Sequence, residues 1–255
     1  MNLSNKTIVI TGACSGIGAE LARLARFQGA TVIGIDRNLP QLTLDGFFQA
    51  DLGDPASIQA LVAQLPARID ALCNVAGVPG TSPTDLVGRV NYLGLRALST
   101  ALVPRMPPGS SLVNIASVLG AEWPLRLEQH KALAGVQGFA EGQQWLAANP
   151  VPQSTCYQYF KEALIVWSLQ QAGVWFRDHS IRVNCVAPGP VFTPILDDFV
   201  SMLGEERLAR DAARIKRPAL ADEVAAVITF LCSDASRWVN GANIPVDGGL
   251  AASYV

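Results

Sequence analysis

Tyr157 and Lys161 are the two residues whose types and spacing point most directly to chemistry. They stand at the start of a stretch predicted to be helical, which continues to Phe176 without a proline. Residues four apart share one face of a helix, so both side chains are expected to point into the same space. An ammonium lowers the pKa of a neighbouring phenol from about 10. Such a pair predicts proton exchange with an alcohol or carbonyl, although the same spacing also occurs on ordinary surface helices.

The composition limits the kinds of protein this chain can be. It has 255 residues, half of them hydrophobic, which suffices for one α/β domain over residues 1–255. A net charge of −2 gives no footprint for nucleic acid. No apolar run reaches the roughly 18 residues of a membrane span, and the start of the chain leaves no room for a signal peptide. The five scattered cysteines form no CxxC pair or Cys/His cluster, so we expect no metal site and a cytoplasmic location.

A glycine-rich turn at residues 11–18 predicts a nucleotide site. It follows a buried strand at residues 6–10 and precedes an amphipathic helix at residues 19–28, which Gly29 ends. Glycines allow the backbone to turn tightly and to approach a pyrophosphate, and the helix N-terminus supplies free N–H groups and a positive dipole. The alternative is a glycine-rich turn without function.

Acidic residues end the next two predicted strands, at residues 31–35 and 47–52. Asp36 stands 20 positions after Gly16, where an acid accepts hydrogen bonds from the adenosine ribose. Its charge repels a 2′-phosphate, which favours NAD over NADP, whereas Arg37 would stabilise that phosphate. Asp51 is expected either to hydrogen-bond the adenine or to act as a turn residue.

The remaining chain continues the alternation of strands and helices. Further strands are predicted at residues 69–77, 110–117, 181–187 and 242–246, with helices at 55–65 and over most of 84–106. The pattern predicts a single-domain Rossmann fold, a doubly wound sheet of seven parallel strands. Ser117 falls at the carboxyl end of a strand, where such sheets hold ligands. Asn91, in an apolar stretch, is expected to be a structural clamp or part of a polar relay.

These landmarks together resemble the classical short-chain dehydrogenase/reductase family over nearly the whole chain. The matching pieces are Thr11-Gly12-xxx-Gly16-Ile17-Gly18, Asn74-Val75-Ala76-Gly77, Asn91, Ser117, Tyr157-xxx-Lys161, Asn184 and Pro188-Gly189. Ser117 and Tyr157 are 40 positions apart, which is wider than in most of the family. The extra residues, about 120–154, have helical character at 129–148. We expect this insertion either to pair subunits or to wall the substrate pocket.

The resemblance implies a role for each matching residue. Tyr157 is implied as the general acid/base, and Lys161 as the group that lowers its pKa and holds the nicotinamide ribose. Ser117 is implied to stabilise the substrate oxygen, and Asn91 to anchor a water that links Lys161 to solvent. The implied cofactor contacts are Thr11, Gly12, Ser15, Gly16, Ile17, Gly18, Asp36, Arg37, Asp51, Leu52, Asn74, Ala76, Gly77, Tyr157, Lys161, Pro188, Gly189, Val191 and Thr193.

Substrate contacts in this family come mostly from the segment after Pro188-Gly189, here a lid expected at about 190–217. Apolar residues between 195 and 203 recur at helical spacing, which also fits simple packing on the body. The predicted substrate residues are Val118, Leu119, Trp123, Ile195, Leu196 and Phe199. No cationic cluster is evident for a carboxylate or phosphate, so the expected substrate is an uncharged, hydrophobic alcohol or carbonyl.

The sequence thus predicts an NAD-dependent oxidoreductase that converts a hydrophobic alcohol into its aldehyde or ketone, within a dimer or tetramer. Within the family, the resemblance favours coniferyl alcohol as the substrate, with a 3α-hydroxysteroid as the alternative. A cofactor-binding regulator without catalysis is a third hypothesis, and the presence of Ser117, Tyr157 and Lys161 argues against it.

Three further residues have the types but not the patterns of catalytic groups. His130 and His179 have no matching carboxylate or nucleophile pattern, so we expect ordinary surface or packing residues. Tyr159 stands at the wrong spacing from Lys161 and is expected to line a pocket or to pack.

Overall fold

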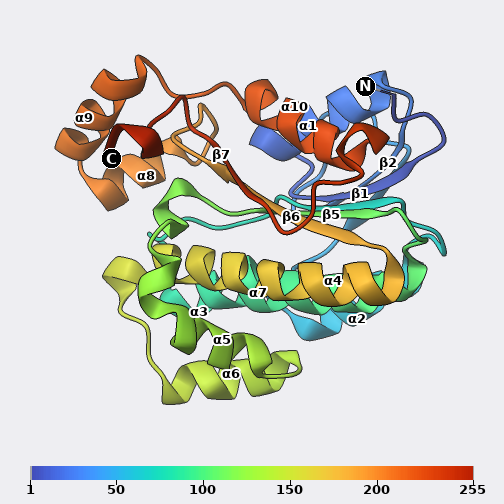
Figure 1. Cartoon of the computed structure of the whole chain (residues 1–255), viewed down its shortest axis with the longest axis horizontal. Helices are drawn as coiled ribbons and strands as arrows, with labels where there is room; N and C mark the ends of the chain where they lie inside the picture. The colour runs from blue at the N-terminus through green and yellow to red at the C-terminus, as the bar shows by residue number, and fades with distance from the viewer. Residues whose placement is uncertain (1, 255) are drawn as a thin grey trace.

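Seven parallel strands form one central sheet in the computed structural model, which describes residues 2–254 (Figure 1). Their order is β3-β2-β1-β4-β5-β6-β7. The winding reverses between β1 and β4, where an open α/β sheet leaves a crevice at its carboxyl edge. The predicted doubly wound Rossmann fold is confirmed. The strands are β1 (Thr7–Thr11), β2 (Thr31–Asp36), β3 (Gly46–Gln49), β4 (Ala71–Asn74), β5 (Ser111–Ile115), β6 (Arg182–Pro188) and β7 (Asn243–Val246).

Helices cover both faces of the sheet. One face carries α1 (Gly16–Phe27) and α10 (Ala221–Cys232) (Figure 1). The other face carries α2 (Pro55–Gln64), α4 (Leu95–Leu102) and α7 (Cys156–His179). A large apolar cluster fills the space between the sheet and each helical layer. Because both faces are covered, every residue of β4, β5 and β6 is buried, as expected for parallel strands that read as continuous apolar runs.

Local chemistry determines where several helices begin and end. The Asp54 side chain accepts hydrogen bonds from the N–H groups of Ala56 and Ser57, which caps α2. Pro55 takes the first helical position, where a backbone donor has no partner to lose. The long helix α7 ends at Ser180, whose φ of 56° lies in the left-handed region. Ser180 thus fixes the end of α7, the helix that carries Tyr157 and Lys161.

The predicted helix over residues 84–106 is interrupted in the structure. It consists of α3 (Thr84–Gly88), a π-helical turn (Arg89–Gly94), α4 and a 3₁₀ turn (Val103–Arg105). The π-helical turn contains Asn91. Such turns are rare and commonly occur at functional sites. Gly94, at its end, lies against the carbonyl oxygen of Leu52 so closely that a Cβ atom would overlap it.

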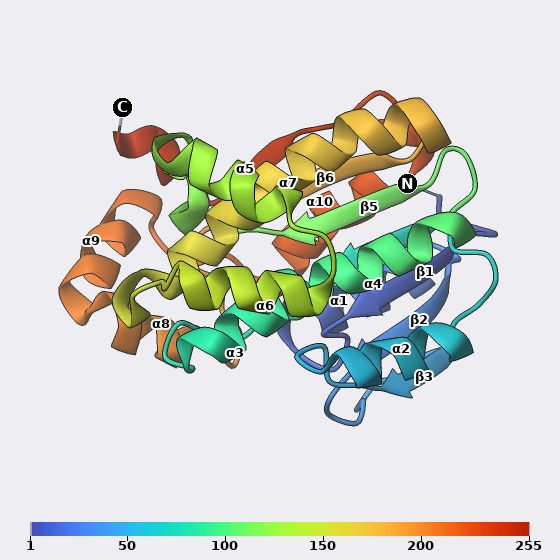
Figure 2. The same ribbon diagram turned by 90° about the horizontal axis from the view of Figure 1, so that it is seen from below.

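The insertion, expected to have helical character at 129–148, folds as two helices. α5 (Leu127–Gly135) and α6 (Phe139–Ala148) are separated by a turn at Gly138, whose φ of 78° suits glycine. Both helices form an outer layer on the side of α7 and α4 that faces away from the sheet (Figures 1 and 2). α5 packs on α7, and α6 packs on the π-helical turn.

The predicted lid contains two short helices joined at Gly204, α8 (Leu196–Leu203) and α9 (Glu205–Ile215). They lie beside the C-terminal 3₁₀ turn Ala251–Tyr254, at the end of the molecule on the left of Figure 1. Within residues 2–254, no helix is both long enough and apolar enough to cross a membrane.

Candidate active site

A cleft of about 420 Å³ follows the carboxyl ends of the strands and joins most of the predicted site. Its walls come from the turn after β1, the ends of β2 and β4, the residues after β5, helix α7 and the lid. The predicted cofactor residues that line it are Gly12, Ser15, Gly16, Ile17, Gly18, Asp36, Arg37, Asp51, Leu52, Ala76, Gly77, Tyr157, Lys161, Pro188, Gly189, Val191 and Thr193.

The glycine turn is shaped for close approach of a pyrophosphate. Gly12 has a φ of 69°, and a Cβ atom there would lie 2.8 Å from the backbone nitrogen of Ala76. A Cβ at Gly18 would overlap the carbonyl oxygen of Gly12. α1 begins at Gly16, and Ser15 makes no side-chain capping bond to it. Its first N–H groups therefore remain free for a phosphate, so the turn fits a dinucleotide.

Asp36 closes the adenosine end of the cleft. Its Oδ2 accepts a hydrogen bond from the N–H of Cys14 at 3.0 Å, and its Oδ1 accepts one from the N–H of Asn38 at 2.9 Å. These bonds hold the carboxylate in place, and each oxygen retains a lone pair for a ribose hydroxyl. Burial, followed by the charge of Asp36, raises the pKa of the Cys14 thiol to about 11, which keeps this thiol protonated. Arg37 lines the same end.

Asp51 has one of the two roles that the sequence left open, that of a turn residue. Its Oδ1 accepts a hydrogen bond from the N–H of Gly53 at 2.7 Å, which forms a local turn. The residue also lines the cleft together with Leu52, so it is available to a bound adenine. That contact stays a prediction.

Thr11 and Asn74 do not line the cleft, in contrast to the expectation of direct cofactor contacts. The hydroxyl of Thr11 accepts hydrogen bonds from the N–H groups of Val75 and Ala76 at 3.0 and 3.1 Å. The buried Asn74 amide donates to Ser99 and Asn114, both at 2.9 Å. The Thr11 side chain therefore holds the turn after β4, and the Asn74 side chain holds the end of β4, both outside the cleft lining.

Ser117, Tyr157 and Lys161 meet in the middle of the cleft. Ser117 directly follows β5, and its Oγ accepts a hydrogen bond from the N–H of Leu119 at 3.1 Å. That bond leaves the hydroxyl hydrogen to be donated, either to the Tyr157 phenol oxygen or to a ligand. The Lys161 ammonium donates to the carbonyl oxygen of Ile115 at 2.6 Å and lies 5.5 Å from the centre of the Tyr157 ring. The spacing on α7 thus places both side chains on one face, as predicted.

Burial dominates the electrostatics of the pair. It raises the pKa of Tyr157, which a hydrogen bond with Ser117 partly offsets. It also lowers the pKa of Lys161 to about 8. Both shifts favour neutral groups. The sequence predicted that Lys161 lowers the pKa of Tyr157, but in the protein chain alone burial has the larger effect.

Asn91 acts as a two-point clamp. Its Oδ1 accepts a hydrogen bond from the N–H of Val78 at 2.8 Å, and its Nδ2 donates to the carbonyl oxygen of Val78 at 2.9 Å. It does not line the cleft, although Gly77 lies between it and Lys161. The clamp is one of the two roles expected from the sequence, and the water relay stays a prediction.

The predicted lid contacts Tyr157. The ring of Phe199 lies edge-on to Tyr157, with the ring centres 5.1 Å apart. Thr81 donates to Asp198 at 2.8 Å, which links α8 to the loop after β4. Of the predicted substrate residues, the cleft is lined by Val118, Leu119, Ile195 and Phe199.

Leu196 and Trp123 do not line the cleft, so the structure does not bring these two residues together with the other predicted substrate residues. Trp123 packs against a cluster that contains Ile165 and Ala187. More generally, no cleft-lining residue within the described chain falls between 120 and 154. The insertion therefore does not wall the substrate pocket, because its helices cover the outer side of α7.

Glu162 forms a buried cluster that sequence analysis missed. The Nε atom of Arg126 donates to Oε2 of Glu162 at 2.7 Å. The Nε2 atom of His130 lies 2.8 Å from the same oxygen. His130 is fully buried, which fits the predicted packing role, and its partner Glu162 is a carboxylate that the sequence pattern did not reveal. Tyr159 packs on His130 with ring centres 4.7 Å apart. His179 is exposed, as expected. Only the fold brings Glu162 to partners 32 and 36 positions upstream.

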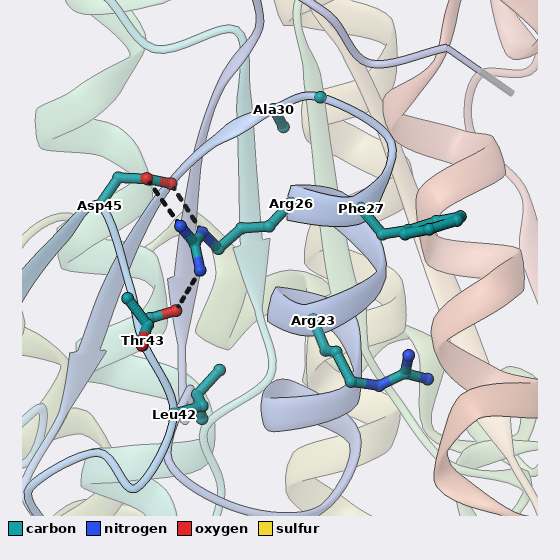
Figure 3. Close-up of a pocket in the computed structure, with 8 residues that line it drawn as sticks. Arg23, Arg26, Phe27, Ala30, Leu42, Thr43 and Asp45 are labelled. Atoms are coloured by element: carbon teal, nitrogen blue, oxygen red, sulfur yellow. Dashed lines mark hydrogen bonds and ion pairs between the residues drawn. The ribbon is translucent and has the colours of Figure 1, made fainter.

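An open depression beside the start of β2 is unrelated to this chemistry (Figure 3). Arg26 there donates to Asp45 at 3.2 Å and to the carbonyl oxygen of Thr43 at 2.8 Å, and Arg23 pairs with Glu20 at 2.8 Å. The start of a parallel strand lies at the edge of the sheet opposite to the catalytic cleft. The arginines of this depression thus stabilise the local structure around it.

Comparisons with known proteins agree with this geometry. The family model described as "short chain dehydrogenase" matches residues 6–141, and one described as "Enoyl-(Acyl carrier protein) reductase" matches residues 145–251. The chain therefore belongs to the short-chain dehydrogenase family, as predicted, and is an oxidoreductase of that family.

Individual relatives show the similarity along the full length. A coniferyl-alcohol dehydrogenase of Pseudomonas sp. (strain HR199) is 64% identical and aligns over 100% of both chains. A 3-alpha-hydroxysteroid dehydrogenase/carbonyl reductase of Comamonas testosteroni is 32% identical over 96% of each. The crystal structure of the 3-alpha-hydroxysteroid dehydrogenase from Pseudomonas sp. B-0831 complexed with NADH superposes with a TM-score of 0.80, at 30% identity and 98% coverage of both chains.

Proposed function

We propose that this protein is an NAD-dependent alcohol dehydrogenase that oxidises coniferyl alcohol to coniferyl aldehyde. The observation that carries the proposal is the meeting of Ser117, Tyr157 and Lys161 in one cleft with the glycine turn and Asp36. The substrate is inferred from the 64% identity to a relative named for coniferyl alcohol. The apolar residues Val118, Leu119 and Phe199 along the cleft suit an aromatic alcohol.

The residues of this chain supply proton transfer and charge control. The substrate hydroxyl binds between the Ser117 hydroxyl and the Tyr157 phenol, and Tyr157 removes its proton. Ser117 donates a hydrogen bond to the oxygen while negative charge develops on it. Oxidised nicotinamide, held by the glycine turn, Asp36 and Lys161, would supply the acceptor for the hydride of the carbinol carbon and a positive charge. Because burial alone raises the pKa of Tyr157, cationic Lys161 and that added charge are what favour the phenolate.

Asp36 supports NAD as the cofactor. Its carboxylate is fixed at the adenosine end of the cleft, where it accepts from ribose hydroxyls and repels a 2′-phosphate. Arg37 beside it is the feature that would admit NADP.

A 3α-hydroxysteroid is the second candidate substrate. It is supported by the TM-score of 0.80 to a steroid dehydrogenase structure that holds NADH. The apolar cleft walls suit a steroid as well as an aromatic ring.

A panel of turnover assays tests the proposal. Purified protein is mixed with NAD or NADP and with coniferyl alcohol or a 3α-hydroxysteroid, and formation of the reduced cofactor is followed by absorbance. We expect rapid NADH formation with coniferyl alcohol, and roughly tenfold or more lower kcat/KM with NADP because of the Asp36 charge. Turnover of the steroid alone would move the assignment to the second candidate. No turnover with either alcohol would contradict the proposal.

A further inference from the structure

Asp211 is a buried carboxylate on the wall of the cleft that the proton-transfer chemistry does not use. It lies on α9 of the lid, and 5% of the residue is exposed. Leu203 and Leu250 line the same cleft, and Phe199, on the adjoining helix α8, rests on Tyr157. Asp211 therefore belongs to the lid end of the cleft, whereas Asp36 closes the cofactor end. A buried charge beside apolar side chains is costly unless it has hydrogen-bond partners.

Within residues 2–254, only one oxygen of this carboxylate has a close partner. The hydroxyl of Tyr254 donates to Oδ1 at 2.6 Å. The Nε atom of Arg207 is 3.9 Å from Oδ2, which is too long for a hydrogen bond. Arg214 fixes the C-terminal turn separately, because it stacks on the Tyr254 ring at 4.1 Å and donates to the carbonyl oxygen of Ser253 at 2.9 Å. Among residues 2–254, Oδ2 is thus left with capacity to accept a hydrogen bond from a ligand.

We propose that Asp211 is a specificity residue that accepts a hydrogen bond from a hydroxyl at the end of the substrate remote from the reacting carbon. This inference rests on the proposed function, in which the phenol hydroxyl of coniferyl alcohol is that group. An ionised carboxylate only accepts hydrogen bonds, so it selects a donor. A methyl ether in place of the phenol has no hydrogen to donate. A steroid that ends in a ketone places an acceptor against an acceptor and is disfavoured.

Three alcohols separate the hydroxyl from the rest of the substrate. They are coniferyl alcohol, its phenol O-methyl ether, and cinnamyl alcohol, which lacks ring oxygens. For the wild-type protein with NAD, we expect kcat/KM to be about tenfold to a hundredfold higher for the phenol than for the ether, as for a hydrogen bond to a charged group. In Asp211→Asn the ratio falls towards equality, because the amide presents a donor as well as an acceptor.

Two variants separate substrate recognition from a structural role. Tyr254→Phe removes the hydrogen bond to the C-terminal turn but leaves the carboxylate, so it is expected to keep the preference for the phenol. Asp197→Asn changes an exposed carboxylate on α8 that does not line the cleft, and is expected to behave as wild type. If Asp211→Asn and Tyr254→Phe slow all three alcohols alike and leave the ratio unchanged, Asp211 is only a latch for the C-terminus, and the inference is overturned.

The ratio of kcat/KM for the phenol to kcat/KM for its ether, measured in the wild-type protein, tests the inference even if Asp211→Asn fails to fold. Equal kcat/KM for the phenol and its ether overturns the inference while the proposed function stands. Absence of turnover with all three alcohols contradicts the proposed function and the inference together. Preference for the phenol that survives in Tyr254→Phe supports Asp211 as the recognising group.

Discussion

Lys161 is buried within the site, and its ammonium is held by the carbonyl oxygen of Ile115 at 2.6 Å. Burial lowers its pKa from 10.5 to about 8, so the charged form is the less favoured one above that pH. The same burial raises the pKa of Tyr157. The sequence predicted the pairing of these residues correctly, because the four-residue spacing determines the shared helix face. It could not predict how fully the lid, β5 and α7 together exclude water from both groups.

The lowered pKa of Lys161 predicts a pH-dependent stability. Between about pH 8 and 10.5 the unfolded chain retains the lysine proton that the folded chain has lost. Stability therefore rises with pH in this window, by at most about 1.4 kcal/mol per pH unit. Urea unfolding of wild type and Lys161→Met across this range measures the effect. The free energy of unfolding of wild type should rise relative to that of the variant, and parallel curves would contradict the assignment.

At the scale of the helices, the insertion is attached to α7, which carries Tyr157, through the buried carboxylate of Glu162. Glu162 of α7 is buried and binds Arg126 and His130, which lie at the start and within the first turns of α5. At the other end of α5, Arg96 of α4 donates to the carbonyl oxygens of Leu133 and Val136 at 3.2 and 2.6 Å. Both ends of α5 are thus fixed to the layer that carries Tyr157.

Removing the charge of Glu162 should loosen this attachment. Burial disfavours the carboxylate, but hydrogen bonds and charge from His130 and Arg126 outweigh burial and lower its pKa. Its contribution to stability is therefore present above the ordinary carboxyl pKa of 4.5 and is lost as the pH falls. We expect Glu162→Gln to reduce the free energy of unfolding by roughly 1–3 kcal/mol at neutral pH.

The matched control is Glu128→Gln on α5. Glu128 is an exposed carboxylate whose one ion pair among the described residues is with Lys131 at 2.8 Å, so its loss should cost at most about 1 kcal/mol. Chemical denaturation of both variants at neutral pH gives the comparison. Equal destabilisation by the two substitutions would show that the cluster around Glu162 does not hold the insertion.

Strands were easier to predict than the packing of helices. Apolar runs between glycine turns located all seven strands, and the alternation with helices predicted that the strands run parallel. The insertion split at Gly138, and its position on the outer side of α7 depends on Glu162 and Arg96, whose partners are distant in sequence. Periodicity alone carries no information about such long-range contacts. The positions of Thr11 and Asn74 outside the cleft lining were missed for the same reason, since their partners lie in the loop after β4, on β5 and on α4.

At the scale of the whole molecule, one cleft joins a cofactor end at Asp36, a catalytic centre at Tyr157 and a lid end at Asp211. The reversal of winding between β1 and β4 opens the first part. The lid and the C-terminal turn meet at the lid end of the cleft, where Tyr254 contacts Asp211. The insertion lies outside this cleft, which leaves subunit pairing as its remaining predicted role. The dimer or tetramer stays a prediction.

The most direct test of the account compares wild type with Tyr157→Phe in two assays, NADH formation from coniferyl alcohol and binding of NADH. The substitution removes the hydroxyl that takes the substrate proton and leaves the ring that packs on Phe199. We predict that kcat falls about 10²- to 10⁴-fold while NADH binding is retained. Near-normal turnover by Tyr157→Phe would contradict the assignment of Tyr157 as the general base, and with it the proposed chemistry of the cleft.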